Sequence, residues 1–425
     1  MNVNQKDTGA ESGQRGECLI SLARACRNAL TPFRNERRRN KNFTFGRQFE
    51  EVIEVEGKLM TEQEYIRSEG GVPLKNNLIR KIVRNVGGLF RDDLEQQMQE
   101  WEPEVKERGR LNRVETLFTR TFEEFLISGM AVVRKWRGMR DGVYGVWTDP
   151  VSPESFFFDP LARDPRGMDM EIVGQVHELP VERFCIAFAR DPVELRRLEA
   201  LAGDERRMTV YEIWQRTGKL VKSGDRWIPD HVWRYAYVTH TGVILREGDS
   251  PYPGGRHPFV VAAYPFLDGE IHSFVGDLID QQRYTNRLIT LYDWVVRASA
   301  KGVLLYPEEA VSSKYDFLKV RNEWCKFNGV IVYNSHKGTV KPTQVTGNNM
   351  NIGIGELLDI QLKMMEDVSG VNGVLQGRQT SGSVSGSLYN RQTENALVSL
   401  RDIIGTFRSF ITDSLELDSL LARSS

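Results

Sequence analysis

Residues 270–415 constrain the fold of this chain most, because three long helices are predicted within this one stretch. Apolar side chains recur at spacings of three and four residues over 273–299, 352–368 and 388–415. That period places them on one side of a helix, as a stripe that packs against a neighbour. The sequence leaves open whether the stripes fill the core of one chain or form contacts between copies of the chain.

Two connections of different character separate the predicted helices. Residues 303–351 are predicted to form a small α/β unit, with strands at Val303–Tyr306 and Gly329–Tyr333 and a short helix at Glu308–Lys319. The second connection, Ser369–Gly386, is rich in glycine and serine and has one charged residue, Arg378. Loops longer than about 12 to 15 residues are uncommon in compact domains and are usually functional or disordered.

The first third of the chain is predicted to be mainly helical. We expect disorder over residues 1–16 and a helix over about Cys18–Leu30. Helices are predicted again over 74–126, with a break at Pro103. Between them, the basic run Arg34–Lys41 could contact phosphates, although a solvated surface or a subunit contact is the stronger interpretation.

A β-rich region follows these helices, where β-branched and aromatic residues replace the helical pattern. Strands are predicted at Ala131–Trp136, Gly142–Trp147 and Phe156–Phe158. Two hairpins are predicted, one turning at Thr217–Lys219 and the other at Thr239–Gly242. A β-rich module between two helical regions predicts an α+β fold.

The overall charge argues against a protein that grips nucleic acid through its phosphates. The 425 residues include 57 Lys and Arg and 58 Asp and Glu, which gives a formal net charge of −1. Proteins that hold DNA or RNA electrostatically are usually strongly basic. At this length, with 40% hydrophobic residues, the chain can bury a full core and is expected to form two or three domains.

Cysteine usage and hydropathy predict a soluble protein in a reducing compartment. The cysteines at 18, 26, 185 and 325 form no Cys-x-x-Cys pair and are expected to be reduced thiols. The most apolar run, Phe259–Leu267, is too short to span a bilayer and contains a proline. The N-terminus has no signal-peptide core, so we expect the protein to stay in the compartment in which it is made.

The motifs of common enzymes are missing. The chain has neither the Gly-x-x-x-x-Gly-Lys-Ser/Thr pattern that cradles phosphates nor a Gly-x-Gly-x-x-Gly that opens a helix after a strand. Gly382–Gly386 has the spacing of a hydrolase nucleophile elbow, but its central residue is Val384. The six histidines are scattered, and none belongs to a His-x-x-x-His pair. We therefore expect no catalytic residue, no metal site and no cofactor.

The order of elements and three short motifs resemble the portal proteins of tailed bacteriophages. The motifs are Val151–Pro160, which contains Phe156-Phe157-Phe158 between two X-Pro turns, then Ser250-Pro251-Tyr252 with His257-Pro258-Phe259, and Asp280-Gln281-Gln282 with Asn286. The helix, insert, helix, glycine-rich loop and helix that follow are similar to the portal stem, clip, stem, tunnel loop and wing helix. The resemblance covers about residues 75–420 and rests on this combination.

The resemblance implies a portal-like α+β fold with a defined division of the chain. Residues 1–73 would be a partly disordered N-terminal arm, 74–270 a helical and then β-rich wing, 271–302 a stem helix, 303–351 a small α/β clip, 352–368 a second stem helix, 369–386 a tunnel loop and 387–425 a long wing helix with a truncated C-terminus. Portal proteins generally continue into a crown beyond that helix. The resemblance therefore also implies a crown that is short or missing here.

The same resemblance implies a function in the virion. Portal proteins form a homo-oligomeric ring, typically of twelve subunits, at one vertex of the capsid. Double-stranded DNA passes through the channel of the ring during packaging and ejection. The expected partners are the large terminase subunit, head-completion or adaptor proteins, and the major capsid and scaffolding proteins, with no membrane. The protein would occupy the host bacterial cytoplasm during assembly and then the portal vertex of the virion.

Site residues carried over by position fall into three sets. Expected DNA contacts in the tunnel loop are Arg378, Gln379, Thr380, Ser381 and Ser383. Expected channel-lining residues of the second stem helix are Glu356, Asp359, Lys363 and Glu366, in a helix that is net acidic. Expected partner-docking residues of the clip are Lys314, Lys319, Arg321, His336 and Lys337. An acidic wall suits a conduit that surrounds DNA without holding it, since each neutralised phosphate strengthens binding.

Two other functions remain open from the sequence. A different phage head–tail connector or structural protein would also form rings, but it would not need a helix, a clip and a helix in this order. A nucleic-acid-processing enzyme is disfavoured by the missing motifs, and metal-dependent nuclease or ATPase assays would test it.

Overall fold

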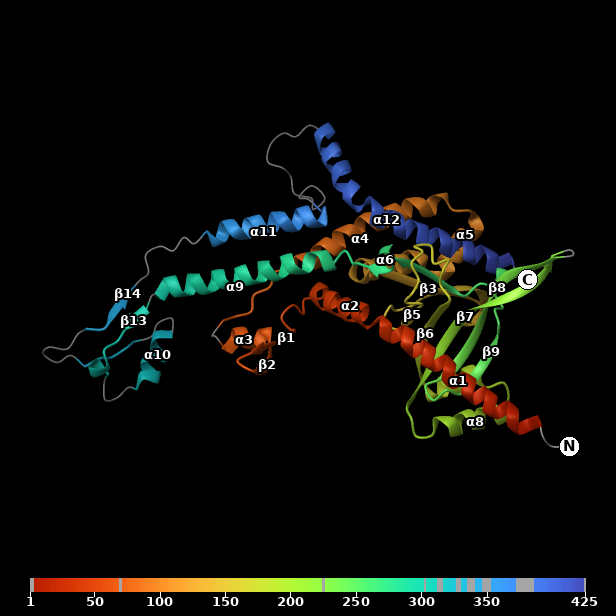
Figure 1. The fold of residues 1–425 in the computed structure, drawn as a ribbon. Coiled ribbons are helices and arrows are strands. Elements are labelled where there is room, and N and C mark those ends of the chain that lie inside the picture. The colour runs from red at the N-terminus through yellow and green to blue at the C-terminus, as the bar shows by residue number, and fades with distance from the viewer. Residues whose placement is uncertain are drawn as a thin grey trace. The chain divides into compact units, whose positions relative to one another are not determined.

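Two compact units make up the chain in the computed structural model, which describes residues 4–68, 71–223, 226–301, 303–311, 316–325, 330–334, 341–345, 353–371 and 386–423. Unit 1 comprises Met1–Arg47, Asn77–Asp280 and Glu366–Ser425, and unit 2 comprises Gln48–Asn76 and Gln281–Met365. Both units contain helices and antiparallel strand pairs (Figure 1). This mixture agrees with the predicted α+β class.

Two antiparallel sheets form the centre of unit 1. One has the strand order β5-β6-β7-β8-β9 and the other the order β10-β3-β4. The strands are β3 (Met130–Arg140), β4 (Val143–Pro150), β5 (Phe156–Phe158), β6 (Ile172–Pro180), β7 (Arg207–Ser223), β8 (Arg226–Thr239), β9 (Ile244–Asp249) and β10 (Phe259–Ala263), with a small ladder of β11 (Pro265–Leu267) and β12 (Glu270–Ile271). The three strands predicted between residues 131 and 158 are thus confirmed.

Helices cover these sheets and pack on each other. Those of unit 1 are α1 (Asn4–Ala29), α2 (Thr31–Thr44), α4 (Leu78–Glu100), α5 (Pro103–Asn112), α6 (Val114–Ser128), α7 (Val181–Phe188), α8 (Pro192–Ala202) and α12 (Gly386–Arg423), with 3-10 turns η1 (Pro253–Gly255) and η2 (Gly276–Leu278). Pro103 begins α5, as expected from the fixed φ of proline at a first helical position. The predicted break there and the predicted last helix are confirmed.

Unit 2 has shorter elements around one long helix. They are β1 (Val52–Val55), β2 (Lys58–Thr61), α3 (Glu62–Ser68), α9 (Ile279–Lys301), β13 (Val303–Leu305), η3 (Glu308–Ala310), α10 (Phe317–Cys325), β14 (Thr343–Val345) and α11 (Ile354–Ser369), the last of which continues into unit 1. The helices predicted over 273–299 and 352–368 are confirmed as α9 and α11.

Alternation along β7 assigns its side chains to opposite faces of the five-stranded sheet. Tyr211 and Ile213 are buried in a cluster with Ala23 and Cys26 of α1, which crosses that face (Figure 1). Met208 and its neighbour Val210 point to the other face and pack with α7 and α8. The sheet is therefore covered by helices on both sides, and its apolar residues form a separate core cluster on each face.

Aromatic rings join α4, α6 and α12 in the helical part of unit 1. Phe90 of α4 stacks on Phe122 of α6 with ring centroids 4.2 Å apart. Phe407 of α12 lies 5.1 Å from Phe90 and 5.0 Å from Phe122. All three rings are fully buried, and such pairs contribute about 0.5–1.5 kcal/mol beyond burial. In this region the apolar stripe of the last helix fills a core within the chain.

A buried carboxylate ties the two sheets together. Oε1 of Glu212 on β7 accepts hydrogen bonds from Arg134 of β3 at 3.0 Å, Trp214 at 3.0 Å and Tyr237 of β8 at 3.2 Å. Its Oε2 lies 2.8 Å from Nε2 of His177 on β6. Burial alone would raise the pKa of Glu212, but Arg134 and the other donors outweigh it and lower this pKa from 4.5 to about 2.

A second buried pair fixes the C-terminal part of α12. The Nζ of Lys135 on β3 donates to Oδ2 of Asp418 at 2.7 Å and to Oγ1 of Thr148 on β4 at 2.7 Å. All three side chains are buried. Burial lowers the pKa of Lys135 and raises the pKa of Asp418, so each group depends on the other to remain charged.

The structure corrects one interpretation of the N-terminal region in part. Helix α1 spans Asn4–Ala29, and the disorder expected over residues 1–16 stays a prediction. The basic run on α2 is only partly a solvated surface, because Arg37 is buried and pairs with Glu124 at 2.6 Å and Glu154 at 3.3 Å. Arg38 also pairs with Glu154, at 3.2 Å. Carboxylates distant in sequence neutralise these arginines, which the local pattern did not show.

One predicted hairpin turn is also wrong. β7 continues through Thr217–Lys219 in an unbroken register, in which Gly218 pairs with His231, and it reaches Ser223. Pairing with β8 keeps this segment extended although Thr-Gly-Lys favours a turn. The second turn, at Thr239–Gly242, is confirmed, and Gly242 has a φ of 88°, a conformation that glycine adopts easily.

The Lys135–Asp418 pair gives a first prediction. Asp418→Ala should lower the free energy of unfolding by about 3–5 kcal/mol, because it leaves the ammonium of Lys135 buried without a counter-charge. The double variant Lys135→Met/Asp418→Leu should lose much less, since it removes both charges. Urea denaturation measures both. Equal losses in the single and the double variant would contradict the assignment.

The lowered pKa of Glu212 gives a prediction of pH dependence. The stabilisation by ionised Glu212 is present above its ordinary pKa of 4.5 and is lost as the pH falls through about 2. Over this window the wild type should lose about 3 kcal/mol more stability than Glu212→Gln, which cannot titrate at this position. Denaturant titrations at several pH values measure the difference. Parallel pH curves for the two proteins would exclude the role given to Glu212.

Candidate functional site

Buried amides bind the segment Gln48–Asn76 to α9 within unit 2. The Nε2 of Gln282 donates to the carbonyl oxygen of Asn76 at 2.6 Å and to Oδ1 of Asn286 at 3.0 Å. The Nδ2 of Asn286 donates to Oε1 of Gln48 at 2.8 Å. The side chains of Gln48, Gln282 and Asn286 are buried, and the network satisfies polar groups that would otherwise destabilise the fold.

Two ion pairs strengthen the same attachment. Arg283 of α9 pairs with Glu51, and Arg287 lies 3.8 Å from Glu62 of α3. The segment therefore meets α9 at several successive turns. The motif Asp280-Gln281-Gln282-x-x-x-Asn286 is one of the three motifs that resemble portal proteins. Its role in attaching the segment to α9 was not predicted from the sequence. Amides four residues apart share one face of a helix, and that spacing could have indicated a polar packing face.

Several large apolar residues of α9 are exposed, mainly toward its C-terminal end. Gln282, Thr285, Asn286 and Leu288 are buried in the first half of the helix, whereas Tyr292 and Val296, further along it, are exposed. The exposed large residues are Tyr284, Leu291, Tyr292 and Val296, each between 43% and 51% accessible. A helix that buries amides and exposes aromatic and branched side chains presents an unpartnered apolar surface.

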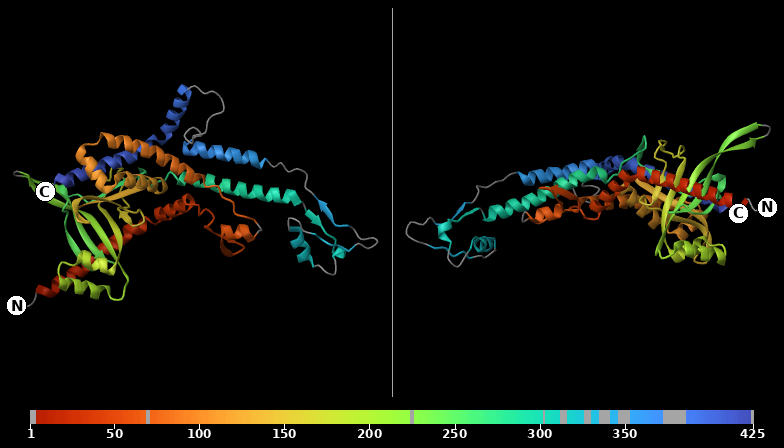
Figure 2. Two further views of the ribbon diagram at one scale, coloured as in Figure 1. Left: turned by 180° about the vertical axis from the view of Figure 1, so that it is seen from behind. Right: turned by 60° about the horizontal axis from the view of Figure 1, so that its bottom comes forward.

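A strand pair links the two helices on either side of the insert. β13 follows α9 and β14 precedes α11, and the pair is antiparallel, with Val303 opposite Val345 and Leu305 opposite Thr343. Both views in Figure 2 place this pair beyond the end of α9. The strand predicted at Val303–Tyr306 is confirmed as β13, and it lies at the base of the insert.

The interior of the insert differs from the prediction. In place of one helix over Glu308–Lys319, η3 ends at Ala310 and α10 begins at Phe317, where the side chain of Asp316 accepts a hydrogen bond from the amide of Lys319 at 2.7 Å. This cap sets the start of α10. No strand forms within residues 330–334 either, where Tyr333 makes only an isolated bridge with Val311. Both predictions are wrong.

Two of the five docking residues predicted in the insert are among the described residues. Lys319 and Arg321 are exposed on α10, beside Phe317 and Leu318, which are 51% and 59% accessible. The helix therefore presents basic and apolar groups together. The other three predicted residues, Lys314, His336 and Lys337, lie outside the described residues.

Helix α11 has three distinct faces. Ile354 and Met365 lie on its buried face. A second face carries the exposed apolar residues Leu357, Ile360 and Met364, which are 41%, 53% and 45% accessible. The third face carries the predicted channel-lining residues Glu356, Asp359, Lys363 and Glu366, of which the first three are exposed and Glu366 is half-buried. Three of these four charged groups are carboxylates.

The predicted DNA contacts cannot be placed. Arg378, Gln379, Thr380, Ser381 and Ser383 all lie outside the described residues. On either side of them, Val371 is buried and α12 begins at Gly386. Their role remains a prediction from the sequence.

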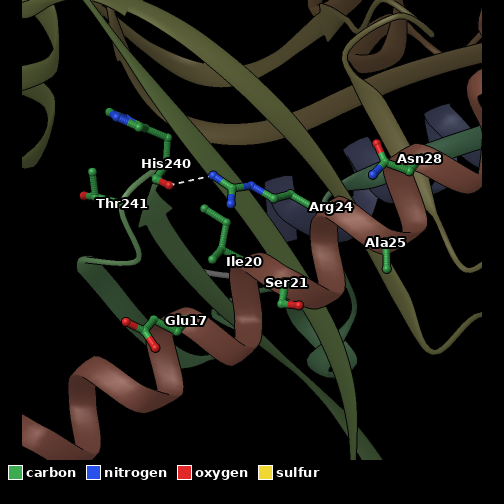
Figure 3. A pocket seen from close by; sticks show the side chains of 8 residues that line it. All are labelled: Glu17, Ile20, Ser21, Arg24, Ala25, Asn28, His240 and Thr241. Carbon is green, nitrogen blue, oxygen red and sulfur yellow. Dashed lines mark hydrogen bonds between the residues drawn. The ribbon is translucent and has the colours of Figure 1, made fainter.

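A surface pocket of about 430 Å³ lies between α1 and the β8–β9 turn (Figure 3). Its lining residues are Glu17, Ile20, Ser21, Arg24, Ala25, Asn28, His240 and Thr241. Nη2 of Arg24 donates to the carbonyl oxygen of His240 at 2.7 Å, as the dashed line in Figure 3 shows. None of the predicted site residues lines this pocket.

Metal-binding clusters and membrane-spanning helices are both absent from the described residues. No group of three or more His, Cys, Asp or Glu side chains there is arranged to hold a metal ion. None of the helices in the same part of the chain is both long enough and apolar enough to cross a membrane.

Comparison with known proteins gave one match. A family model described as Phage P22-like portal protein matches residues 109–417. The match begins within α5 and ends within α12, so it includes both sheets of unit 1 and α9, α10 and α11. A search of the curated proteins found no match.

The amide network of α9 gives a prediction. Asn286→Ala should speed amide hydrogen exchange across residues 52–68, because it leaves the buried amide of Gln48 without its donor, a loss of about 1–3 kcal/mol. Exchange within the sheets of unit 1 should not change. Tyr284→Ala, on the exposed side of the same helix, is the matched control. Equal exchange in wild type and Asn286→Ala would show that the network does not hold the segment.

Proposed function

Because the chain belongs to the P22-like portal protein family of phages, we propose that its copies assemble into a ring at one capsid vertex, through which double-stranded DNA is packaged and ejected. The family match over residues 109–417 carries this proposal. Portal proteins are structural. The sequence has neither the Gly-x-x-x-x-Gly-Lys-Ser/Thr pattern nor a Gly-x-Gly-x-x-Gly that opens a helix after a strand. A ring of about twelve subunits is the expected assembly.

The division of the chain follows the family resemblance. We assign residues 74–270 to the wing, 271–302 and 352–368 to the stem, 303–351 to the clip and 369–386 to the tunnel loop, with α12 as the long wing helix. The succession of α9, the β13–β14 pair and α11 supports the order of stem, clip and stem. The proposed DNA contacts are in the tunnel loop: Arg378, Gln379 and the hydroxyls of Thr380, Ser381 and Ser383.

Exposed apolar faces on α9 and α11 support assembly of copies. Each helix leaves large apolar side chains uncovered in the single chain, including Tyr292 and Ile360. Contiguous apolar surface of this kind usually marks an interaction site. In a closed ring, heterologous contacts repeated around the axis would cover it in every subunit.

The charged face of α11 supports a channel that does not hold DNA. Glu356 and Asp359 are exposed on it, and Lys363 is the basic residue among them. Repeated around a ring, this face would surround the duplex with more negative than positive charge. Few phosphates would then be neutralised, so binding through counterion release would be weak.

The exposed surface of α10 supports a docking role for the clip. Lys319 and Arg321 flank apolar side chains there, a composition typical of protein interfaces with a polar rim. We propose the large terminase subunit and later the head-completion or adaptor protein as occupants of the clip. The major capsid and scaffolding proteins are the proposed neighbours of the ring in the virion, after assembly in the host bacterial cytoplasm.

Assembly state tests the proposal directly. Native mass spectrometry with electron microscopy should show rings of the wild-type chain, with a channel wide enough for duplex DNA. Ile360→Asp/Met364→Asp should abolish the rings, because it places charge on a face that must become buried. The matched control Glu356→Gln/Asp359→Asn changes the charged face and should leave assembly intact. A wild type that remains monomeric under all conditions would overturn the proposed function.

A further inference from the structure

The β7–β8 hairpin extends far beyond the sheet to which it belongs. β6 pairs with β7 only as far as Gln215, and β9 pairs with β8 only from Arg234 onwards. Beyond these points the two strands pair with each other alone, out to Ser223 opposite Arg226. We call residues 217–223 and 226–232 the ribbon. Figures 1 and 2 show its free end projecting from the sheet in every view.

The ribbon exposes large apolar side chains and strand edges, which a folded chain usually buries or pairs. Leu220, Trp227 and Ile228 are 64%, 65% and 48% accessible. Both of its outer edges lack a neighbouring strand within the described residues. An isolated two-stranded ribbon is marginally stable in water, and exposed edges attract other chains. The ribbon therefore has the properties of a segment that is completed by a partner.

The charge of the ribbon indicates the chemistry of that partner. Its two strands carry Lys219, Lys222 and Arg226 against Asp230, and the sequence of the turn between them adds Asp225, so basic residues outnumber acidic ones by three to two. The side chains of Lys222 and Arg226 are exposed near the free end. A complementary surface should combine carboxylates with apolar contacts.

Unit 1 has a surface of that kind at the junction of α4 and α5. No basic residue occurs from Asp92 to Val105. Glu100, Glu102 and Glu104 are exposed at this junction, which we call the acidic corner. Among the described residues, Glu100 and Glu102 have no ion-pair partner, and the side chain of Glu104 is 87% accessible although it lies 3.9 Å from Arg108. Among the side chains that the structure describes, none of the ion pairs joins the corner to the ribbon of the same chain.

We propose that the ribbon of one subunit docks on the acidic corner of the next subunit, an inference that rests on the proposed ring. Two different patches on one chain make a heterologous contact, the kind from which closed rings are built. Salt bridges would set the register, and Trp227 and Leu220 would supply apolar area. Double-stranded DNA is a poorer occupant, because the exposed leucine, isoleucine and tryptophan have no counterpart in a phosphate surface.

Charge reversal with rescue tests the contact. Lys222→Glu/Arg226→Glu should raise the concentration at which half of the chains are in rings by at least about tenfold, or about 1.4 kcal/mol per contact. Adding Glu100→Lys, Glu102→Lys and Glu104→Lys to the same chain should restore assembly. Arg196→Glu/Arg206→Glu, two exposed arginines elsewhere in unit 1, is the matched control and should assemble normally. Circular dichroism confirms that each variant is folded.

A second readout identifies the contact itself. Carbodiimide treatment of rings mixed from ¹⁴N and ¹⁵N chains should yield mixed-isotope cross-links between Lys222 and the glutamates of the corner. Unchanged assembly of the ribbon variant, or failure of the corner variant to rescue it, would overturn the inference while leaving the proposed ring intact. Intact rings with weakened binding to a DNA duplex would also overturn it and assign the ribbon to DNA. A monomeric wild type would overturn both.

Discussion

One buried carboxylate, Glu212, holds the β-rich part of unit 1 together. It accepts hydrogen bonds from three donors at 3.0–3.2 Å and lies 2.8 Å from His177, so strands of both sheets converge on its two oxygens. A fully buried charge is tolerated only when it is paired and hydrogen-bonded. Because Arg134 supplies the pairing from the other sheet, the packing of one sheet on the other depends on this contact.

Polar anchors of this kind recur at two other places, one in unit 1 and one in unit 2. Lys135 and Asp418 fix the C-terminal part of α12, and the amides of Gln282 and Asn286 fix the segment 48–76 on α9. Apolar packing tolerates small shifts, whereas a buried polar pair has one good geometry. In the proposed ring, where an error in subunit shape would repeat in every copy, such fixed geometry suits a closed assembly.

The sequence predicted most of the regular elements and few of their partners. The period of apolar residues located α9, α11 and α12, and β-branched runs located β3, β4 and β5. Pairing decided the errors: β8 kept Thr217–Lys219 extended, and Glu124 and Glu154 neutralised Arg37. The two glutamates are 87 and 117 residues from Arg37 in sequence, so no local pattern could indicate them.

The candidate site shows the same limit. Helical spacing alone places Glu356, Asp359 and Lys363 together on α11, where they are exposed, and their position along a channel stays a prediction. The apolar stripe of α9 was also visible, but the sequence could not tell whether it was covered. In the structure Leu278, Ile279 and Leu288 of this stripe are buried, whereas Tyr292 and Val296 are exposed. Burial therefore changes along the helix, which the sequence could not show.

The net charge of −1 does not show how charged residues are distributed over the surface, and this distribution matters for the proposed DNA conduit. Charge is sorted by surface: carboxylates dominate the outer face of α11 and the acidic corner, whereas basic residues dominate α10 and the ribbon. Near-neutrality overall keeps the protein from binding DNA at every surface. Local excesses of positive or negative charge then remain available for specific contacts. Contacts between oppositely charged patches strengthen as the salt concentration is lowered, and so does any binding to DNA. The ribbon and the acidic corner, which would join subunits, must therefore lie away from the duplex, whereas the charged face of α11 would surround it.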